Sequence, residues 1–343
     1  MAMSIKIIKP GLFTTVQDLG RFGHQSEGFS PAGVMDRPSY EILNALLETE
    51  QQPALEITMI GPKIKFLSQN LFAITGAKFS ATLNGESIPH QTVIKAEPGD
   101  ILDLGAAQEG MRAYIGFAEQ LDIPLVEGSY ATHTRTRVGG YKGRVLKEND
   151  IIPTRASNMD ISLIGRSSDF SSFSAASDLP IGIMDGPQLE SFSKRTIAEI
   201  EHIEFQVSES SDRMGYRLKG GSIQPMESAD IISEPVALGS IQVPKDGNPI
   251  ILLNDRQTVG GYTKIGTVID SDIVDIIQKR PGETIRFEWV TFNEANEILA
   301  RKGRKLADAK EKLRRYPQRY LKNIRPTQRK IKSVLKGDSI PWT

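Results

Sequence analysis

The stretch ALEITMIGPKIKFLSQNLFAIT, residues 54–75, decides the fold class of this chain. It contains three short apolar runs (54–58, 63–67 and 71–75) whose length and content of isoleucine, phenylalanine and threonine are typical of strands. Turn-forming pairs separate them: Gly61-Pro62 follows the first run and Gln69-Asn70 precedes the third. Short strands at such regular spacing predict a β-barrel or sandwich.

The alternation of apolar runs and turns continues along most of the chain, so we expect a mainly β fold with few short helices. One helix is predicted over 38–47, where Pro38 suits a first turn and four leucine or isoleucine side chains share a face. Another is predicted over 271–279, with Ser271 as its N-cap. Residues 14–37 and 118–150 are polar and are expected to form long loops. Further strands are predicted at 4–9, 79–84, 112–117, 181–184, 202–208, 231–232, 250–253, 264–269 and 284–290.

A short motif that occurs twice divides the chain into two related halves. Pro98-Gly99-Asp100-Ile101-Leu102 is similar to Pro281-Gly282-Glu283-Thr284-Ile285, and each leads into an apolar run. The repeated motif predicts two related β-barrel domains. The alternative is that the two copies are unrelated examples of a common hairpin turn. The predicted organisation is an N-terminal β domain at 1–165, a linker at 166–180, a C-terminal β domain at 181–292 and a basic helical tail at 293–343.

Composition limits the class of protein. With 343 residues, of which 39% are hydrophobic and 24% charged, the chain has the composition of a soluble globular protein of two or three domains. It contains no cysteine, which excludes disulfides, a thiolate nucleophile and a cysteine-bound metal, and is consistent with a cytoplasmic protein. No run of 18 apolar residues predicts a membrane span, and the first ten residues do not resemble a signal peptide.

Charge is unevenly distributed along the chain. Residues 301–336 contain 15 Lys or Arg and only Asp308 and Glu311 as acids, although the whole chain is neutral. In the predicted helix 293–323, leucines recur every seven residues at 299, 306 and 313. One interpretation is a basic arm for nucleic acid or an acidic partner. The other, which we favour, is a helix that packs its apolar stripe on the body and leaves its charges in solvent.

Two polar, glycine-rich stretches lie about 240 residues apart: TVQDLGRFG (15–23) and DRQTVGGY (255–262). Each combines a carboxylate, an amide and a guanidinium with glycines. Glycine lets a ligand approach the backbone, Asp supplies an acceptor or base, and Arg supplies a rigid fork of donors. The alternative is two tight turns in which these side chains cap their own backbone.

Several chemistries lack their sequence signatures. There is no GxxxxGK[ST] phosphate loop, no GxGxxG dinucleotide motif and no GxSxG nucleophile elbow. The four histidines form no metal-ligand pair such as HxxxH, so no metal site is predicted. What remains is a set of polar loops on a β scaffold, where binding sites are usually found.

Four motifs resemble one family. They are TVQDLGRFGHQSEGFSPAGVMD (15–36), ALEIT-x-x-GP (54–62), RMGYRLKG (213–220) and GSIQVPKDGNPIILLNDRQTVGGYTKIGTVI (239–269). All four resemble the family of the 5-oxoprolinase C subunit, also called the KipI antagonist or allophanate hydrolase subunit 2 family. The resemblance runs over about 4–290 and extends to the carboxyltransferase portion of urea carboxylase. It implies cyclophilin-like barrels and a hetero-oligomer with a KipI-like protein, the B subunit, and with the A subunit.

The resemblance implies one of two chemistries on a small amide-type substrate. The first is ATP-dependent opening of 5-oxoproline to glutamate, with ATP bound here or by a partner. The second is carboxyl transfer from carboxybiotin on a separate carrier protein. The expected catalytic residues are Asp18, Asp36, Arg213, Asp255 and Arg256, in which the aspartates act as bases or orienting groups and the arginines clamp anions. The expected substrate-binding residues are Gln17, Arg21, Arg217, Gln257, Gly260, Gly261 and Tyr262.

The chain departs from the family pattern at three places. The family's Gly-Ser-Arg-Ser-Thr is here Gly128-Ser129-Tyr130-Ala131-Thr132, its usual Gly-Asn after the first helix is Glu48-Thr49-Glu50, and its Gly-Gly-Ile segment is replaced by residues 118–122. The loss of an arginine from a loop leaves open a second class of function. In that alternative the chain is a regulatory protein that sequesters a KipI-like inhibitor of a sensor kinase.

Overall fold

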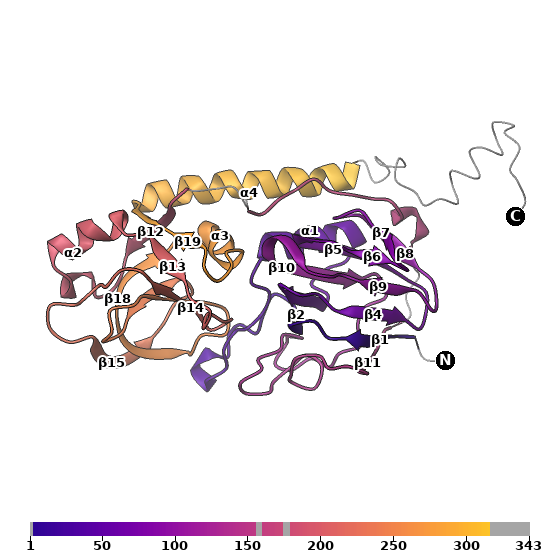
Figure 1. Ribbon diagram of the computed structural model, residues 1–343, viewed down its shortest axis with the longest axis horizontal. Helices are drawn as coiled ribbons and strands as arrows, with labels where there is room; N and C mark the ends of the chain where they lie inside the picture. Colours follow the sequence, from indigo (N-terminus) through magenta and orange to yellow (C-terminus); the bar gives the residue numbers. More distant parts are fainter. Residues whose placement is uncertain (1–2, 156–159, 174–178, 316–343) are drawn as a thin grey trace, which may run out of the picture.

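The computed structural model describes residues 3–155, 160–173 and 179–315. The predicted class is confirmed: the chain is mainly β, with few helices (Figure 1). It forms two halves, each with its own sheets and hydrophobic core, and one long helix lies along both.

Two antiparallel sheets build the N-terminal half. The six-stranded sheet has the order β11-β1-β4-β9-β6-β7, with bounds Ile151–Pro153, Ser4–Lys9, Lys63–Phe66, Ile101–Asp103, Thr82–Leu83 and Glu86–Ser87. The five-stranded sheet has the order β2-β3-β10-β5-β8, with bounds Phe13–Gln17, Ala54–Thr58, Ala107–Phe117, Asn70–Phe79 and Ile94–Ala96.

A core lies between these sheets because apolar side chains alternate along their strands. Ile5 and Phe66 of the first sheet pack with Leu55, Phe72 and Ile115 of the second. The other face of the five-stranded sheet is covered by α1 (Arg37–Leu47) through a second apolar cluster. Both faces of β3 are therefore buried.

The ends of α1 follow from its sequence. The Asp36 carboxylate accepts a hydrogen bond from the Ser39 amide at 3.0 Å, and Pro38 lies in the first turn. The helix ends at Glu48, which has the left-handed conformation (φ +52°) that glycine usually adopts at this position.

The C-terminal half is a nine-stranded, nearly closed sheet around one core. Its order is β19-β13-β14-β17-β16-β18-β12-β20, with β15 paired to the start of β18. The strand bounds, in that order, are Thr284–Ile285, Phe205–Val207, Gly215–Lys219, Ile250–Leu252, Ser240–Val243, Val259–Val268, Ile181–Asp185 and Phe287–Trp289, and β15 is Asp230–Pro235. The short helices α2 (Lys194–Glu199) and α3 (Ile273–Ile277) complete this half.

The long helix α4 (Phe292–Arg315) begins with a capping box. Thr291 and Glu294 exchange hydrogen bonds between their side chains and backbone amides. Leu313 is 4% exposed and Leu306 is partly buried in the cluster beneath α1, whereas Leu299 is 45% exposed. The favoured interpretation is confirmed for Leu306 and Leu313, which pack on the body, but not for Leu299. Two of the charges expected in solvent, Lys302 and Lys310, instead form ion pairs with the body. Residues 316–323 of the prediction lie outside the described residues.

The structure corrects three local predictions. The predicted loop 14–37 begins inside β2, where buried Thr14, Thr15 and Gln17 hide the strand pattern behind polar side chains. The predicted strand 79–84 is split, because β5 ends at Phe79 and β6 begins at Thr82. Ser271 is not the N-cap of α3, since it lies in a 3-10 turn (Asp270–Asp272) that precedes the helix.

Candidate functional site at the junction of the two halves

The segment 30–34, which packs on the first glycine-rich stretch, contacts Asn254, which directly precedes the second stretch, where the halves join. The Asn254 carbonyl accepts hydrogen bonds from the Ala32 amide at 3.2 Å and the Ser30 hydroxyl at 3.1 Å. In return, Asn254 Nδ2 donates to the Val34 carbonyl at 3.0 Å. Gly33 lies between these contacts with φ +86°, and an added Cβ would lie 2.7 Å from the Leu19 carbonyl oxygen. Only glycine allows the segments around Leu19 and Gly33 to pack this closely.

A buried ion-pair cluster crosses the same junction. Arg213 of the C-terminal half donates to both carboxylate oxygens of Asp255, at 3.0 and 2.9 Å, and ion-pairs with Glu56 on β3 of the N-terminal half. Its Nη2 also donates to the Gly33 carbonyl at 2.6 Å. Burial alone lowers the pKa of Arg213, but the charges of Asp255 and Glu56 outweigh it and raise that pKa. Arg213 and Asp255 are therefore occupied with holding the halves together.

Asp36 is a second tie between the halves. Its carboxylate accepts hydrogen bonds from Ser39, from the Ser172 hydroxyl at 2.7 Å and from Gln278 Nε2 at 2.9 Å. Burial raises the pKa of Asp36, against the lowering effect of these donors. Gln278 follows α3, so this contact joins the start of α1 to the end of α3.

Asp18 and Gln17 hold the loop that follows β10. Asp18 accepts from the Ser129 hydroxyl at 2.6 Å and the Tyr130 amide at 2.7 Å. Gln17 Nε2 donates to the Thr132 carbonyl at 3.0 Å, and its Oε1 accepts from the Gly33 amide at 3.1 Å. Both side chains are buried, so they fix the loops that surround Arg21.

Arg21 and Arg256, one from each glycine-rich stretch, have a different environment. Arg21 is 1% exposed and donates to two backbone carbonyls, Val126 at 2.8 Å and Ala131 at 3.2 Å, while its Nη1 is buried without a partner. Arg256 is half-buried and makes only 3.3 Å contacts with two carbonyls. Burial lowers the pKa of both guanidiniums. At Arg21 the charges of Asp18 and Glu127 partly oppose this effect. Within the described residues neither guanidinium forms an ion pair with a carboxylate, so an anion could stabilise both.

The remaining predicted residues are exposed side chains and two glycines of the C-terminal half. Arg217 and Gln257 are exposed, and Tyr262 is 38% exposed. At Gly260 an added Cβ would overlap the Gln242 amide nitrogen, so a larger residue there would require that side chain to move. Gly261 lies beside Ser233 of β15. Gly260 and Tyr262 lie on β18 opposite Glu234 and Asp230 of β15.

Three junction residues were not predicted: Glu56, Arg112 and Gln278. Arg112 is 2% exposed and donates to the Tyr216 hydroxyl at 2.5 Å and to the Ile277 carbonyl. Gln278 Oε1 accepts from the amides of Met111 and Arg112, both at 2.8 Å. One sequence signal could have identified such a residue: a charged side chain inside an otherwise apolar predicted strand, as Glu56 is in ALEIT.

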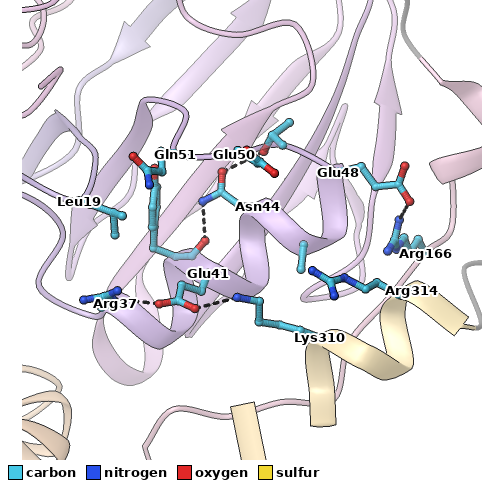
Figure 2. A pocket seen from close by; sticks show the side chains of 13 residues that line it. Leu19, Arg37, Glu41, Asn44, Glu48, Glu50, Gln51, Arg166, Lys310 and Arg314 are labelled. Atoms are coloured by element: carbon cyan, nitrogen blue, oxygen red, sulfur yellow. Dashed lines mark hydrogen bonds and ion pairs between the residues drawn. The ribbon is translucent and has the colours of Figure 1, made fainter. Parts of the chain in front are cut away.

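No group of three or more His, Asp or Glu side chains suited to a metal occurs in the described ranges. In the same part of the chain, no helix has both the length and the apolar content to cross a membrane. A hollow of about 600 Å³ lies between α1 and α4, and Figure 2 shows Glu41 and Asn44 on one side and Lys310 and Arg314 on the other. None of the predicted site residues lines it.

Comparison with known proteins identifies the family. The chain is 34% identical over 292 residues to the C subunit of 5-oxoprolinase from Escherichia coli, a match that covers 85% of this chain and 93% of that protein. It is 30% identical to urea amidolyase of Saccharomyces cerevisiae over 86% of this chain. The structure of Kluyveromyces lactis urea amidolyase superposes with a TM-score of 0.80 and 27% identity over 90% of this chain. The match spans 17% of the yeast protein and 20% of the Kluyveromyces chain. Residues 27–289 match the model of the carboxyltransferase domain, subdomain A and B, and the chain belongs to that family.

Proposed function

We propose that this chain is one subunit of a 5-oxoprolinase-type complex, in which ATP-dependent hydrolysis opens 5-oxoproline to glutamate. The similarity to the C subunit of 5-oxoprolinase covers nearly the whole of that relative. The similarity to the same subunit from Haemophilus influenzae likewise covers 96% of that relative, so the proposal rests on relatives that this chain matches over most of their length.

The observation that carries the proposal is the pair Arg21 and Arg256. Each glycine-rich stretch contributes a guanidinium that is removed from water without a carboxylate partner among the described residues. 5-Oxoproline carries a carboxylate, and water attack on its amide carbonyl develops negative charge on oxygen. Arg21 and Arg256 have the chemistry to bind those two groups, and fixed donors aimed at a developing oxyanion are among the strongest contributions to catalysis.

Asp255, Asp36 and Asp18 then act mainly as orienting groups. Each of these carboxylates already accepts at least two hydrogen bonds. Asp255 fixes Arg213 beside Gly33, and Asp18 fixes the loop that carries the Arg21 acceptors. In the proposed mechanism these contacts hold the guanidiniums in place before substrate arrives, which limits reorganisation during the reaction.

A second candidate is carboxyl transfer from carboxybiotin on a separate carrier. The family model and the 0.80 TM-score with urea amidolyase favour it. The same two guanidiniums would then bind the carboxylate of the transferred group. This sequence has no phosphate loop, so we propose that ATP binds to a partner subunit. The proposed partners are a KipI-like B subunit and an A subunit, and the proposed location is the cytoplasm.

The test is reconstitution. The chain is co-expressed with 5-oxoprolinase A and B subunits, and ATP-dependent glutamate release from 5-oxoproline is measured with and without it. We expect activity that requires the chain, and a loss of about 100-fold for Arg21→Met and Arg256→Met if each guanidinium stabilises the transition state. Arg195→Met, on the exposed helix α2, is the matched control and should keep full activity.

Each outcome decides between the candidates. A stable complex that is inactive on 5-oxoproline but depends on biotinylated carrier for carboxyl transfer would favour the second candidate. A complex that binds a KipI-like protein but has neither activity would contradict both and favour the regulatory alternative. Full activity of Arg21→Met would remove that residue from the mechanism and leave the chain's place in the complex intact.

A further inference from the structure

The helix α4 lies outside the family match and yet contacts both halves. The matched residues end at 289, and α4 begins at Phe292. Figure 1 shows it as one straight element along the C-terminal and N-terminal halves. It packs on the 3-10 turn Asp270–Asp272 of the C-terminal half and on α1 of the N-terminal half.

Lys302 anchors α4 to the C-terminal half. Its ammonium contacts the Ser271 carbonyl at 2.9 Å, Asp272 Oδ1 at 2.9 Å and Asp275 Oδ2 at 2.7 Å. Asp272 is itself fixed, because its other oxygen accepts from the Gly182 amide at 2.9 Å. One ammonium therefore saturates its three donors on the start of α3.

Lys310 and Leu313 anchor α4 to the N-terminal half. Lys310 pairs with Glu41 of α1 at 2.9 Å (Figure 2), and Leu313 is buried against the cluster beneath α1. The Leu313 carbonyl accepts a hydrogen bond from Arg166 Nη2 at 2.9 Å. Arg166 is in turn paired with Glu48 at 2.5 Å.

Glu48 gives independent support for this anchor. It holds a left-handed backbone conformation, φ +52°, at the position where glycine is favoured. A non-glycine residue there costs of order 1 kcal/mol. The Glu48 side chain pairs with Arg166, and Arg166 in turn donates to the Leu313 carbonyl of α4. The strained residue therefore helps to hold the guanidinium that docks α4.

These anchors close a ring around the junction. Lys302 holds α3, and Gln278 at the end of α3 donates to Asp36 at the start of α1. Glu41 of α1 pairs with Lys310, which returns to α4. The two anchoring lysines are eight residues apart, a span of about 12 Å along a helix. Two anchors at that separation resist rotation of one half against the other.

From this ring we infer that α4 is a strut that sets the orientation of the two halves, and that Lys302 and Lys310 are positioning residues for the junction site. Arg21 belongs to one half and Arg256 to the other, so their spacing depends on that orientation. The geometric part of the inference stands without the proposed function; the effect on catalysis rests on it.

The absence of cysteine makes the orientation measurable. Glu86→Cys on β7 and Glu209→Cys after β13 place one exposed label on each half of the full chain, and the distance between the two spin labels is measured by pulsed electron resonance. We expect Lys302→Met with Lys310→Met to broaden or shift the distance distribution. The control is Arg304→Met on the exposed side of α4, which should leave it unchanged.

Leu313→Ala is the second variant, because it weakens the apolar anchor and leaves both ion pairs in place. In the reconstituted complex the lysine variant should lower kcat/KM by about 10-fold or more, since small misplacements of bound groups are costly. An unchanged distribution in both variants would contradict the strut. An altered distribution with unchanged kcat/KM would contradict the positioning role alone, and an inactive wild-type complex would count against the proposed function but not against the strut.

Discussion

Arg213 and Glu56 form a buried ion pair across the junction, although they are 157 positions apart in the sequence. Their side chains are 5% and 2% exposed. Glu56 is further fixed by the Tyr114 hydroxyl at 2.7 Å and the Met35 amide at 2.9 Å. The pair therefore joins the two halves through groups that are satisfied on all sides.

Arg213→Met should destabilise the chain by about 3–5 kcal/mol, because it leaves the carboxylates of Glu56 and Asp255 buried without their partner. The free energy of unfolding in urea measures this. Arg217→Met, four residues away and exposed, is the control and should change it by less than about 0.5 kcal/mol. A similar small change for Arg213→Met would mean that the pair does not hold the halves together.

Arg21→Met should behave differently from Arg213→Met. Removing Arg21 leaves no carboxylate unpaired, and relief of a desolvated charge offsets the loss of two hydrogen bonds to carbonyls. We expect the unfolding free energy to change by no more than about 1 kcal/mol, while binding of an anionic ligand is lost. A loss of stability as large as that of Arg213→Met would assign Arg21 a structural role.

His90 should make the chain less stable in acid. Burial lowers its pKa to about 4, while Gly76, whose carbonyl lies 3.2 Å from Nε2, partly opposes the shift. The unfolded chain, with a pKa near 6.5, takes up the proton first, so stability falls as pH drops from about 6.5 through 4. The upper limit of this effect is about 3 kcal/mol.

The measurement for His90 is the unfolding free energy at pH 7 and at pH 4.5. His90→Gln should reduce the difference between the two values, and His202→Gln, which changes an exposed histidine, should not. An equal pH dependence of His90→Gln and the unaltered chain would show that other groups cause the acid sensitivity.

Gly139→Ala should disrupt the surroundings of Arg21. Gly139 has φ +68°, and an added Cβ would overlap the Ala131 carbonyl and lie 2.8 Å from Arg21 Nη2. We expect a loss of about 2–5 kcal/mol, the sum of backbone strain and overpacking. Gly128→Ala in the same loop, with φ +73° and no atom within 4 Å, should cost only about 1–2 kcal/mol. Equal costs for the two variants, measured by thermal and urea unfolding, would argue against the close contact at Gly139.

Periodicity predicted the elements whose apolar pattern is regular. The strands β1 and β3 and helix α1 begin and end within one residue of their predicted bounds. It missed β2, because threonine and glutamine there are buried through hydrogen bonds and look like loop residues. The division into domains, the site roles, the cofactors and the regulatory alternative stay predictions.

The sequence by itself determined the fold class, the family motifs and the polar glycine-rich stretches, because these depend on residue types at short spacing. Only the tertiary structure decided which polar residues meet. Arg213, Asp255 and Asp36 are residue types typical of a catalytic site. However, Arg213 pairs with Glu56, 157 positions away, and Asp36 accepts from Gln278, 242 positions away. Burial and ion pairing arise from contacts between distant segments, so the sequence could not separate the arginines that hold the halves together from those that remain unpaired.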